Sequence, residues 1–124
     1  MIDHAAKVRV IDAYVDGFAR ADPEAIVALF ASDATVEDPI ASPLKNGSAE
    51  ILEFYKFSMQ TGAKLVLDGP VRTGGAYAAF AFQVRLNLGG DNKVIHVIDT
   101  FKFNEAGKII EMRAFWSPDN MTGF

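Results

Sequence analysis

Two long runs in the second half of the chain alternate between large apolar side chains and small or polar ones, and this pattern constrains the fold more than any other. In the range 78–88, one face carries Phe80, Phe82, Val84, Leu86 and Leu88. In the range 95–103, the matching face carries Ile95, Val97, Asp99, Phe101 and Phe103. Because successive side chains of a strand point to opposite faces, each run predicts a strand with one face in the core. We expect a turn at residues 89–92 to join them.

The first half of the chain carries helical patterns instead. Over about residues 3–20, apolar side chains recur at helical spacing, and Tyr14 lies on the flank of this stripe, next in angle to Phe18. Asp22 and Pro23 are typical of an N-cap and a first helical residue, so they predict a short second helix. We expect three helices: about 3–20, about 23–30, and one that begins near 47–48 and carries Ile51, Phe54, Tyr55 and Met59.

Extended segments precede and follow the third helix. Residues 34–38 alternate and end at Pro39, which has no backbone donor. They predict a short strand that places Asp38 on the same face as Val36. The pattern changes from helical to extended after residues 69–70. Beyond a turn at residues 104–107, the last strand is predicted to have one face made of Ile110, Met112, Ala114 and Trp116.

Together these elements indicate one α+β domain over residues 1–124, in which three N-terminal helices pack in a curved, mainly antiparallel sheet. The chain has 124 residues and 50% of them are apolar, which is enough for one continuous core. The sequence contains neither a linker nor an internal repeat. We therefore expect a single domain.

The composition argues against several classes of function. The net charge is −4 and the 12 basic residues are scattered, so we expect no nucleic-acid partner. With no cysteine, 2 histidines and no glycine-rich phosphate loop, we expect neither a metal nor a cofactor. No segment approaches the roughly 20 apolar residues of a membrane span, and no signal peptide is recognisable. We therefore expect no membrane association and a cytoplasmic location.

Asp99 is the position that most needs an explanation. It interrupts a row of large apolar side chains and cannot change face unless the whole strand shifts its register. A carboxyl group at this position loses contact with water, which raises its pKa and favours the neutral acid, a hydrogen-bond donor. The same argument applies more weakly to Asp38, because its strand is short and ends at a proline.

Each of these residues also has a structural interpretation. A tyrosine on a helix flank, such as Tyr14, is more often a boundary residue of the core than a chemical group. Asp38 before a proline is equally typical of a turn. For Asp99 the functional and structural interpretations stay balanced, because buried acids are rarely left without a partner. Glu37 and His96 fall on faces opposite the two acids, and we interpret both as solvent, interface or structural positions.

The sequence resembles the bacterial Δ5-3-ketosteroid isomerases over almost its full length. The resemblance is densest in residues 26–30 (IVALF), 33–39 (DATVEDP), 54–55 (FY), 79–82 (AFAF), 97–103 (VIDTFKF) and 112–116 (MRAFW). These enzymes belong to a nuclear-transport-factor-like superfamily that also includes polyketide cyclases and limonene epoxide hydrolase. Because this superfamily shares one fold across many activities, the joint presence of Tyr14, Asp38 and Asp99 is the more specific sign.

The resemblance implies a cone-shaped fold with a strongly curved sheet, and a cofactor-free steroid delta-isomerase. Asp38 would move a proton within a Δ5-3-ketosteroid through a dienolate, while Tyr14 and neutral Asp99 would donate hydrogen bonds to the carbonyl oxygen. Ketosteroid isomerases are themselves a standard example of carboxyl groups tuned to opposite roles in one site. Tyr55 would support Tyr14 by hydrogen bonding. Phe30 stands where other members carry a further tyrosine.

The resemblance also implies a pocket for a flat, apolar steroid substrate. Its residues would be Tyr55, Phe54, Phe82, Val84, Phe101, Met112, Ala114 and Trp116. The indole N–H of Trp116 is a candidate donor to the far end of the ligand. By analogy with the family we expect a homodimer that covers Val94 and Ile98 on the outer face of the sheet.

Two other functions stay open from the sequence. The first is a polyketide cyclase-like enzyme or another activity of the superfamily, which would use an acid in an apolar cone on a different substrate. The second is a non-catalytic carrier of hydrophobic ligands. An isomerase needs Tyr14 and Asp99 to converge on one point, whereas a carrier has no reason to bury an acid there.

Overall fold

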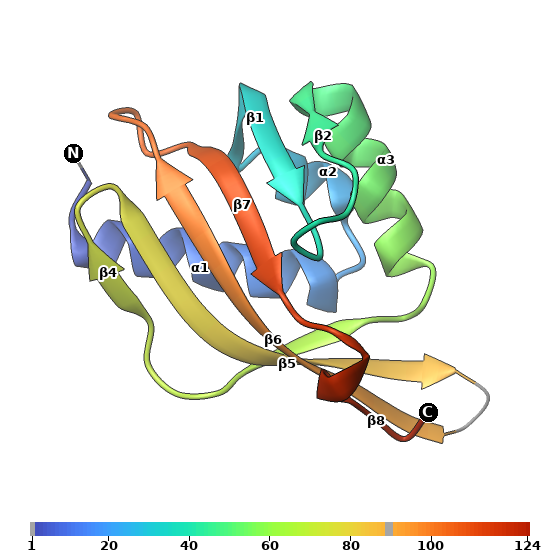
Figure 1. The fold of residues 1–124 in the computed structure, drawn as a ribbon. Coiled ribbons are helices and arrows are strands. Elements are labelled where there is room, and N and C mark those ends of the chain that lie inside the picture. Colours follow the sequence, from blue (N-terminus) through green and yellow to red (C-terminus); the bar gives the residue numbers. More distant parts are fainter. Residues whose placement is uncertain (1, 89–90) are drawn as a thin grey trace.

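The computed structural model describes residues 2–88 and 91–124, so residues 89–90 of the predicted turn lie outside it. Its helices are α1 (His4–Ala19), α2 (Pro23–Val27), α3 (Gly47–Met59) and the short 3₁₀ helix η1 (Pro118–Asn120). Its strands are β1 (Phe30–Glu37), β2 (Lys45–Asn46), β3 (Lys64–Leu67), β4 (Arg72–Gly74), β5 (Tyr77–Leu88), β6 (Asp91–Phe103), β7 (Ile109–Phe115) and β8 (Met121–Thr122). Figure 1 shows α1 lying across a strongly curved sheet, with α2 and α3 beside β1 and β2. The predicted α+β class is confirmed.

The helices begin where capping chemistry places them. Asp3 Oδ1 accepts a hydrogen bond from the backbone N–H of Ala6 at 2.9 Å, so Asp3 is the N-cap of α1. Asp22 Oδ1 accepts in the same way from Ala25 N–H at 3.1 Å, and Pro23 is the first residue of α2. Both starts agree with the sequence-based prediction.

Helix α2 is shorter than predicted, and the strand that follows it is longer. The helix ends at Val27, and β1 already begins at Phe30, whose backbone pairs with Ile109 of β7. Pairing with a distant strand therefore overrides the local helical pattern. Strand β1 ends at Glu37, so Asp38 is the first residue beyond the strand and not its last one.

The strands form one sheet in the order β2-β1-β7-β6-β5-β3, with β4 paired to β5 and β8 paired to β6. Strands β1 and β7 are parallel, and the other described pairs are antiparallel. The expectation of a mainly antiparallel sheet is therefore confirmed. The parallel pair brings the end of β1, near residue 38, next to the end of β7, near residue 114.

Two predictions about the strands are wrong. Strand β3 (Lys64–Leu67) forms before residues 69–70, where the pattern indicated the change to extended structure. In β7 it is Ile109 that is fully buried, while Ile110, predicted to face the core, is only partly buried. The pairing of β6 with β7 shifts register at this point, and such an irregularity changes which side chains face the core.

The predicted core face of the two long strands is confirmed for the side chains that the structure describes. Rings from helix and sheet meet at its centre: the Phe101 centroid lies 5.1 Å from that of Tyr14 and 5.1 Å from that of Phe80. Asp99 lies in the same row, with Phe80 opposite it on β5 and Ala114 opposite it on β7. The register of the sheet therefore carries a carboxyl group into an aromatic core.

Candidate active site

An apolar cavity of about 340 Å³ lies among α1, α3, β3, β5 and β6. This volume is within the range of small-molecule pockets. Aromatic and aliphatic side chains make most of the wall, including Phe18, Phe54, Leu65, Phe82, Val84 and Val97. Tyr14, Asp38 and Asp99 also line the cavity. The three residues that the sequence singled out for chemistry therefore share one apolar chamber.

Asp99 is buried in this chamber without a protein partner. Its side chain is on β6 and the residue is 1% exposed. Neither carboxyl oxygen has a hydrogen-bond partner in the part of the chain that the structure describes. Burial raises the pKa of Asp99 well above its ordinary value, and the nearby charge of Asp38 raises it further. The neutral acid is favoured, and its O–H is available to a ligand.

Tyr14 reaches the same chamber from α1. The residue is 2% exposed, and its hydroxyl oxygen lies 2.9 Å from that of Tyr55 on α3. Burial raises the pKa of Tyr14 well above its ordinary value, with further contributions from Tyr55 and Asp99. The phenol therefore keeps its proton over the physiological range, and the contact with Tyr55 fixes the position of its oxygen. The predicted support of Tyr14 by Tyr55 is present in the structure.

Asp38 is held by a tryptophan that enters from beyond β7. The indole Nε1 of Trp116 donates a hydrogen bond to Asp38 Oδ1 at 2.7 Å. Burial raises the pKa of Asp38 above its ordinary value, while the bond from Trp116 opposes that shift by favouring the carboxylate. From the sequence, this indole N–H was a candidate donor to the far end of a ligand. In the structure it donates to Asp38 instead.

The three groups place a possible base and two possible donors in one largely apolar cavity. The chemical environments of the two acids differ: Asp38 has a donor that favours its ionised form, whereas Asp99 has none. Such a difference separates the pKa values of neighbouring acids and lets one accept a proton while the other donates a hydrogen bond. The arrangement can therefore remove a proton from a bound carbon acid and stabilise an oxyanion.

Most of the predicted pocket residues line the cavity, namely Phe54, Tyr55, Phe82, Val84 and Trp116. Phe101, Met112 and Ala114 do not line it; all three are fully buried in the packed core outside the cavity wall. The cavity also has walls that the sequence did not assign to it: Phe18, Phe57, Ser58, Thr61, Ala63, Leu65, Leu86, Ile95 and Val97. The apolar alternation marked some of these as core residues, but whether a core residue lines a cavity depends on the packing opposite it.

The part of the chain that the structure describes has neither a cluster of metal ligands nor a helix suited to a membrane. Among its residues, no group of three or more His, Cys, Asp or Glu side chains is placed to hold a metal ion. Within the same ranges, no helix has both the length and the apolar character that crossing a membrane requires.

The curved sheet, the three helices and the cavity between them define a class of small α+β cone proteins. The SnoaL-like domain family matches residues 11–112, and the chain belongs to this family. It is similar to a Steroid Delta-isomerase of Nocardioides simplex, with 42% identity over 109 residues, or 87% of each chain. The chain is also similar to a solved structure of the epoxide hydrolase/cyclase-like enzyme SalBIII, which is described as having a role in pyran ring formation in polyether salinomycin. The TM-score is 0.91 and the sequence identity is 24%, over 100% of both chains. That likeness shows the fold alone. The resemblance found in the sequence is therefore confirmed for family and fold.

Proposed function

We propose that this protein is a steroid delta-isomerase, which converts a Δ5-3-ketosteroid to its Δ4 isomer by moving one proton within the substrate. The observation that carries the proposal is the buried, unpartnered Asp99 in the same apolar cavity as Tyr14 and Asp38. A buried polar group without a partner costs about 1–3 kcal/mol, so such a site is complete only when a ligand accepts its hydrogen. The 42% identity to the isomerase of Nocardioides simplex supports the same reaction.

In the proposed reaction Asp38 is the base. Its carboxylate removes a proton from the carbon between the ketone and the alkene, and the electrons of that C–H bond form a dienolate. Protonated Asp38 then returns the proton to the carbon two positions farther along, and the double bond becomes conjugated with the ketone. One carboxyl group can serve as base and then as acid because it lies over one face of the substrate. The step balances in protons and electrons without a co-reactant.

Tyr14 and neutral Asp99 are the proposed donors to the carbonyl oxygen. Negative charge develops there in the dienolate, and preorganised donors stabilise it without the reorganisation that water would need. The raised pKa of each group, caused mainly by burial, favours the protonated form that can donate. Tyr55, with its hydroxyl 2.9 Å from that of Tyr14, is the proposed support for the phenol.

The assay with 5-androstene-3,17-dione tests the proposed function directly. Conjugation of the ketone produces ultraviolet absorbance, so turnover is followed without a coupling enzyme. We expect the purified chain to form the conjugated product. A carrier of hydrophobic ligands would bind the steroid and leave its absorbance unchanged, and a cyclase for another substrate would do the same. Binding without turnover would therefore contradict the proposal.

Replacement of Trp116 by Phe should shift the pH dependence of the reaction. The indole N–H favours ionised Asp38, so its loss raises the pKa of Asp38 further above the ordinary value of about 3.9. Because only ionised Asp38 accepts the proton, the acid limb of kcat/KM should move to higher pH, with a smaller change near neutrality.

Phe82→Leu is the control for the Trp116 variant, because Phe82 lines the same cavity but makes no hydrogen bond to Asp38. It should change kcat/KM without moving the midpoint of the acid limb. A Trp116→Phe midpoint at or below that of the native enzyme would show that the indole does not favour the carboxylate.

A homodimer in the cytoplasm remains part of the proposal. The outer face of the sheet exposes Ile98 at 50% and Phe115 at 47%, and these two residues are paired across β6 and β7. Adjacent exposed apolar side chains favour association through this face. Val94, named from the sequence together with Ile98, is partly buried within the chain.

A further inference from the structure

Glu37 and Asp38 are adjacent in the chain but make contacts on different sides. Asp38 lines the cavity, whereas Glu37 is the register partner of Arg113 on β7. Glu37 Oε1 lies 3.6 Å from Arg113 Nε, and Glu37 Oε2 accepts a hydrogen bond from the backbone N–H of Ala41 at 2.7 Å. One carboxylate therefore joins the sheet to the loop that directly follows the proposed base.

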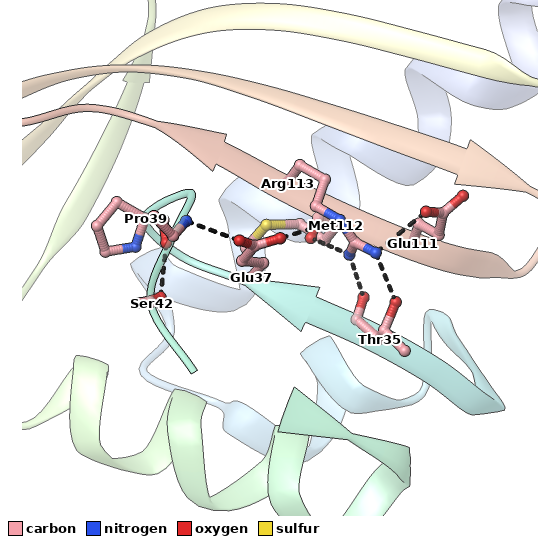
Figure 2. Close-up of polar contacts among 8 residues, drawn as sticks. Thr35, Glu37, Pro39, Ser42, Glu111, Met112 and Arg113 are labelled. Carbon is pink, nitrogen blue, oxygen red and sulfur yellow. Dashed lines mark hydrogen bonds and ion pairs between the residues drawn. The ribbon is translucent and has the colours of Figure 1, made fainter. Parts of the chain in front are cut away.

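Arg113 is a fixed anchor for this carboxylate. Its Nη1 donates to the backbone oxygens of Met112 at 2.9 Å and Thr35 at 3.3 Å, and its Nη2 donates to Thr35 Oγ1 and Glu111 Oε1, both at 3.0 Å. Figure 2 shows the guanidinium between Thr35 of β1 and Glu111 of β7, with Glu37 on its other side. The guanidinium thus ties β1 to β7 at the point where Asp38 leaves the sheet.

The loop at residues 38–42 needs the support that Glu37 gives. Ala41 has a φ of +76°, a conformation that is unfavourable for a residue with a Cβ and persists only when neighbouring contacts hold it. Ile40 N–H donates to Ala114 O at 2.8 Å, and both the N–H and the hydroxyl of Ser42 donate to Pro39 O, at 3.0 and 2.6 Å. The amide of Ala41 is bonded to Glu37 alone among the described contacts.

For holding the loop, the negative charge of Glu37 matters less than the position of its acceptor oxygen. Glu37 Oε1 and Arg113 Nε are 3.6 Å apart, too far for a hydrogen bond, so their ion pair positions the Glu37 carboxylate less strictly than the 2.7 Å bond from Ala41 N–H does. The hydrogen bond to Ala41 needs only an acceptor oxygen at that place, which an amide also supplies. This difference separates a positioning role from a purely electrostatic one.

We propose that Glu37 is a positioning residue for Asp38: by holding the Ala41 amide, it fixes the loop at residues 38–42 and with it the aim of the Asp38 carboxylate over the cavity. The inference rests on the proposed function, in which that carboxylate reaches two carbon atoms of one bound substrate. Trp116 holds an oxygen of Asp38 from the cavity side, and Glu37 holds the backbone beyond it. A misplacement of about 1 Å costs on the order of 10²-fold in rate.

Three variants test this role. Glu37→Ala removes the acceptor for Ala41 and should lower kcat by about 10- to 10²-fold with little change in KM, since substrate binding does not depend on the base. Glu37→Gln keeps an acceptor oxygen and should retain kcat within about 3-fold. Glu111→Ala is the matched control, because it removes another carboxylate from Arg113 but leaves the loop bonds in place. It should leave kcat unchanged.

A deuterium label on the substrate gives a second measurement, the share of deuterium retained in the product. A purely structural role of Glu37 would leave this share unchanged. With deuterium on the carbon that loses the proton, the native enzyme should return a large share of it to the product. A loosely held Asp38 should exchange more of it with water, so retention should fall in Glu37→Ala and stay native in Glu37→Gln and Glu111→Ala. Thermal unfolding of each variant establishes that it is folded, and Glu37→Met, of similar length but without an acceptor oxygen, replaces an alanine variant that does not fold.

The outcomes separate this inference from the proposed function. A native enzyme that turns over the steroid, with Glu37→Ala no worse than Glu111→Ala or with Glu37→Gln as impaired as Glu37→Ala, would overturn the positioning role alone. Unchanged label retention in an impaired alanine or methionine variant would do the same. A native enzyme without turnover would overturn the proposed function and this inference together.

Discussion

Replacement of Asp38 by Asn is expected to lower kcat for a Δ5-3-ketosteroid by about 10⁴-fold, the upper end of what a general base contributes. The amide has the shape of the carboxyl group but cannot accept the proton. Trp116 Nε1, which donates to Asp38 at 2.7 Å, can still donate to the amide oxygen, so the local geometry is kept. Stopped-flow or steady-state assays of ultraviolet absorbance measure the decrease in kcat.

Binding should respond to Asp38→Asn in the opposite direction. A phenolic steroid resembles the dienolate, which forms when Asp38 is already protonated and neutral. The amide imitates that protonated state, so the affinity for the phenolic steroid should be kept or increased. Asp33→Asn is the matched control, because Asp33 is an exposed acid on β1, the strand that directly precedes Asp38. Native turnover in Asp38→Asn would remove Asp38 from its proposed role.

Replacement of Asp99 by Leu is expected to lower kcat by about 10²- to 10³-fold, the usual loss when one oxyanion donor is removed. Leucine fills a similar space in the core but offers no O–H to the carbonyl oxygen. Asp99→Asn keeps an N–H donor and should recover part of the rate. If Tyr14 and Asp99 act on one oxygen, both variants should lower kcat more than they raise KM.

The same leucine variant is expected to be more stable than the native protein at neutral pH. Asp99 has two buried oxygens without a partner in the described chain, and leucine removes this cost. Burial raises the folded-state pKa above the unfolded value of about 3.9, so the stability that the acid contributes is complete below about pH 4 and falls as pH rises toward the folded-state pKa. The increase in Tm for Asp99→Leu should therefore be larger at pH 7 than at pH 4.

Thermal unfolding and turnover, measured on the same preparations, separate the two interpretations of Asp99. A functional acid gives a variant that is slower and at least as stable, a common relation at sites whose groups serve chemistry at the expense of folding. A structural acid gives a variant that is less stable, with a loss of rate equal to the loss of folded protein. The second result would remove one of the two proposed donors, Asp99, from the oxyanion site.

The position of Asp99 could be predicted from the sequence because the side-chain period of a strand leaves no freedom. A shift of one residue would expose Phe101 and Val97, so the apolar row itself specifies the face on which the acid lies. The cap at Asp22 was predicted for a similar reason, because its hydrogen bond reaches only three residues along the chain.

The errors lie where distant strands decide the outcome. The pattern around Phe30 favoured a helix, yet its pairing with Ile109 makes it the start of β1. The irregular register between β6 and β7 makes Ile109 the buried residue in place of Ile110. Neither event has a local signal, because each depends on backbone hydrogen bonds to a segment far along the chain.

The sequence by itself determined the class of fold and the inward face of Asp99, since periodicity sets which side chains face inward and an acid among apolar neighbours is conspicuous. Tyr14 and Asp38 became candidate reactive residues through the resemblance to a known family. Only the tertiary structure decided how those residues are held. The bond from Trp116 to Asp38 and the bond from the Ala41 amide to Glu37 arise when the ends of β1 and β7 meet. Contacts of this kind depend on the shape of the folded chain, which no periodicity of the sequence encodes.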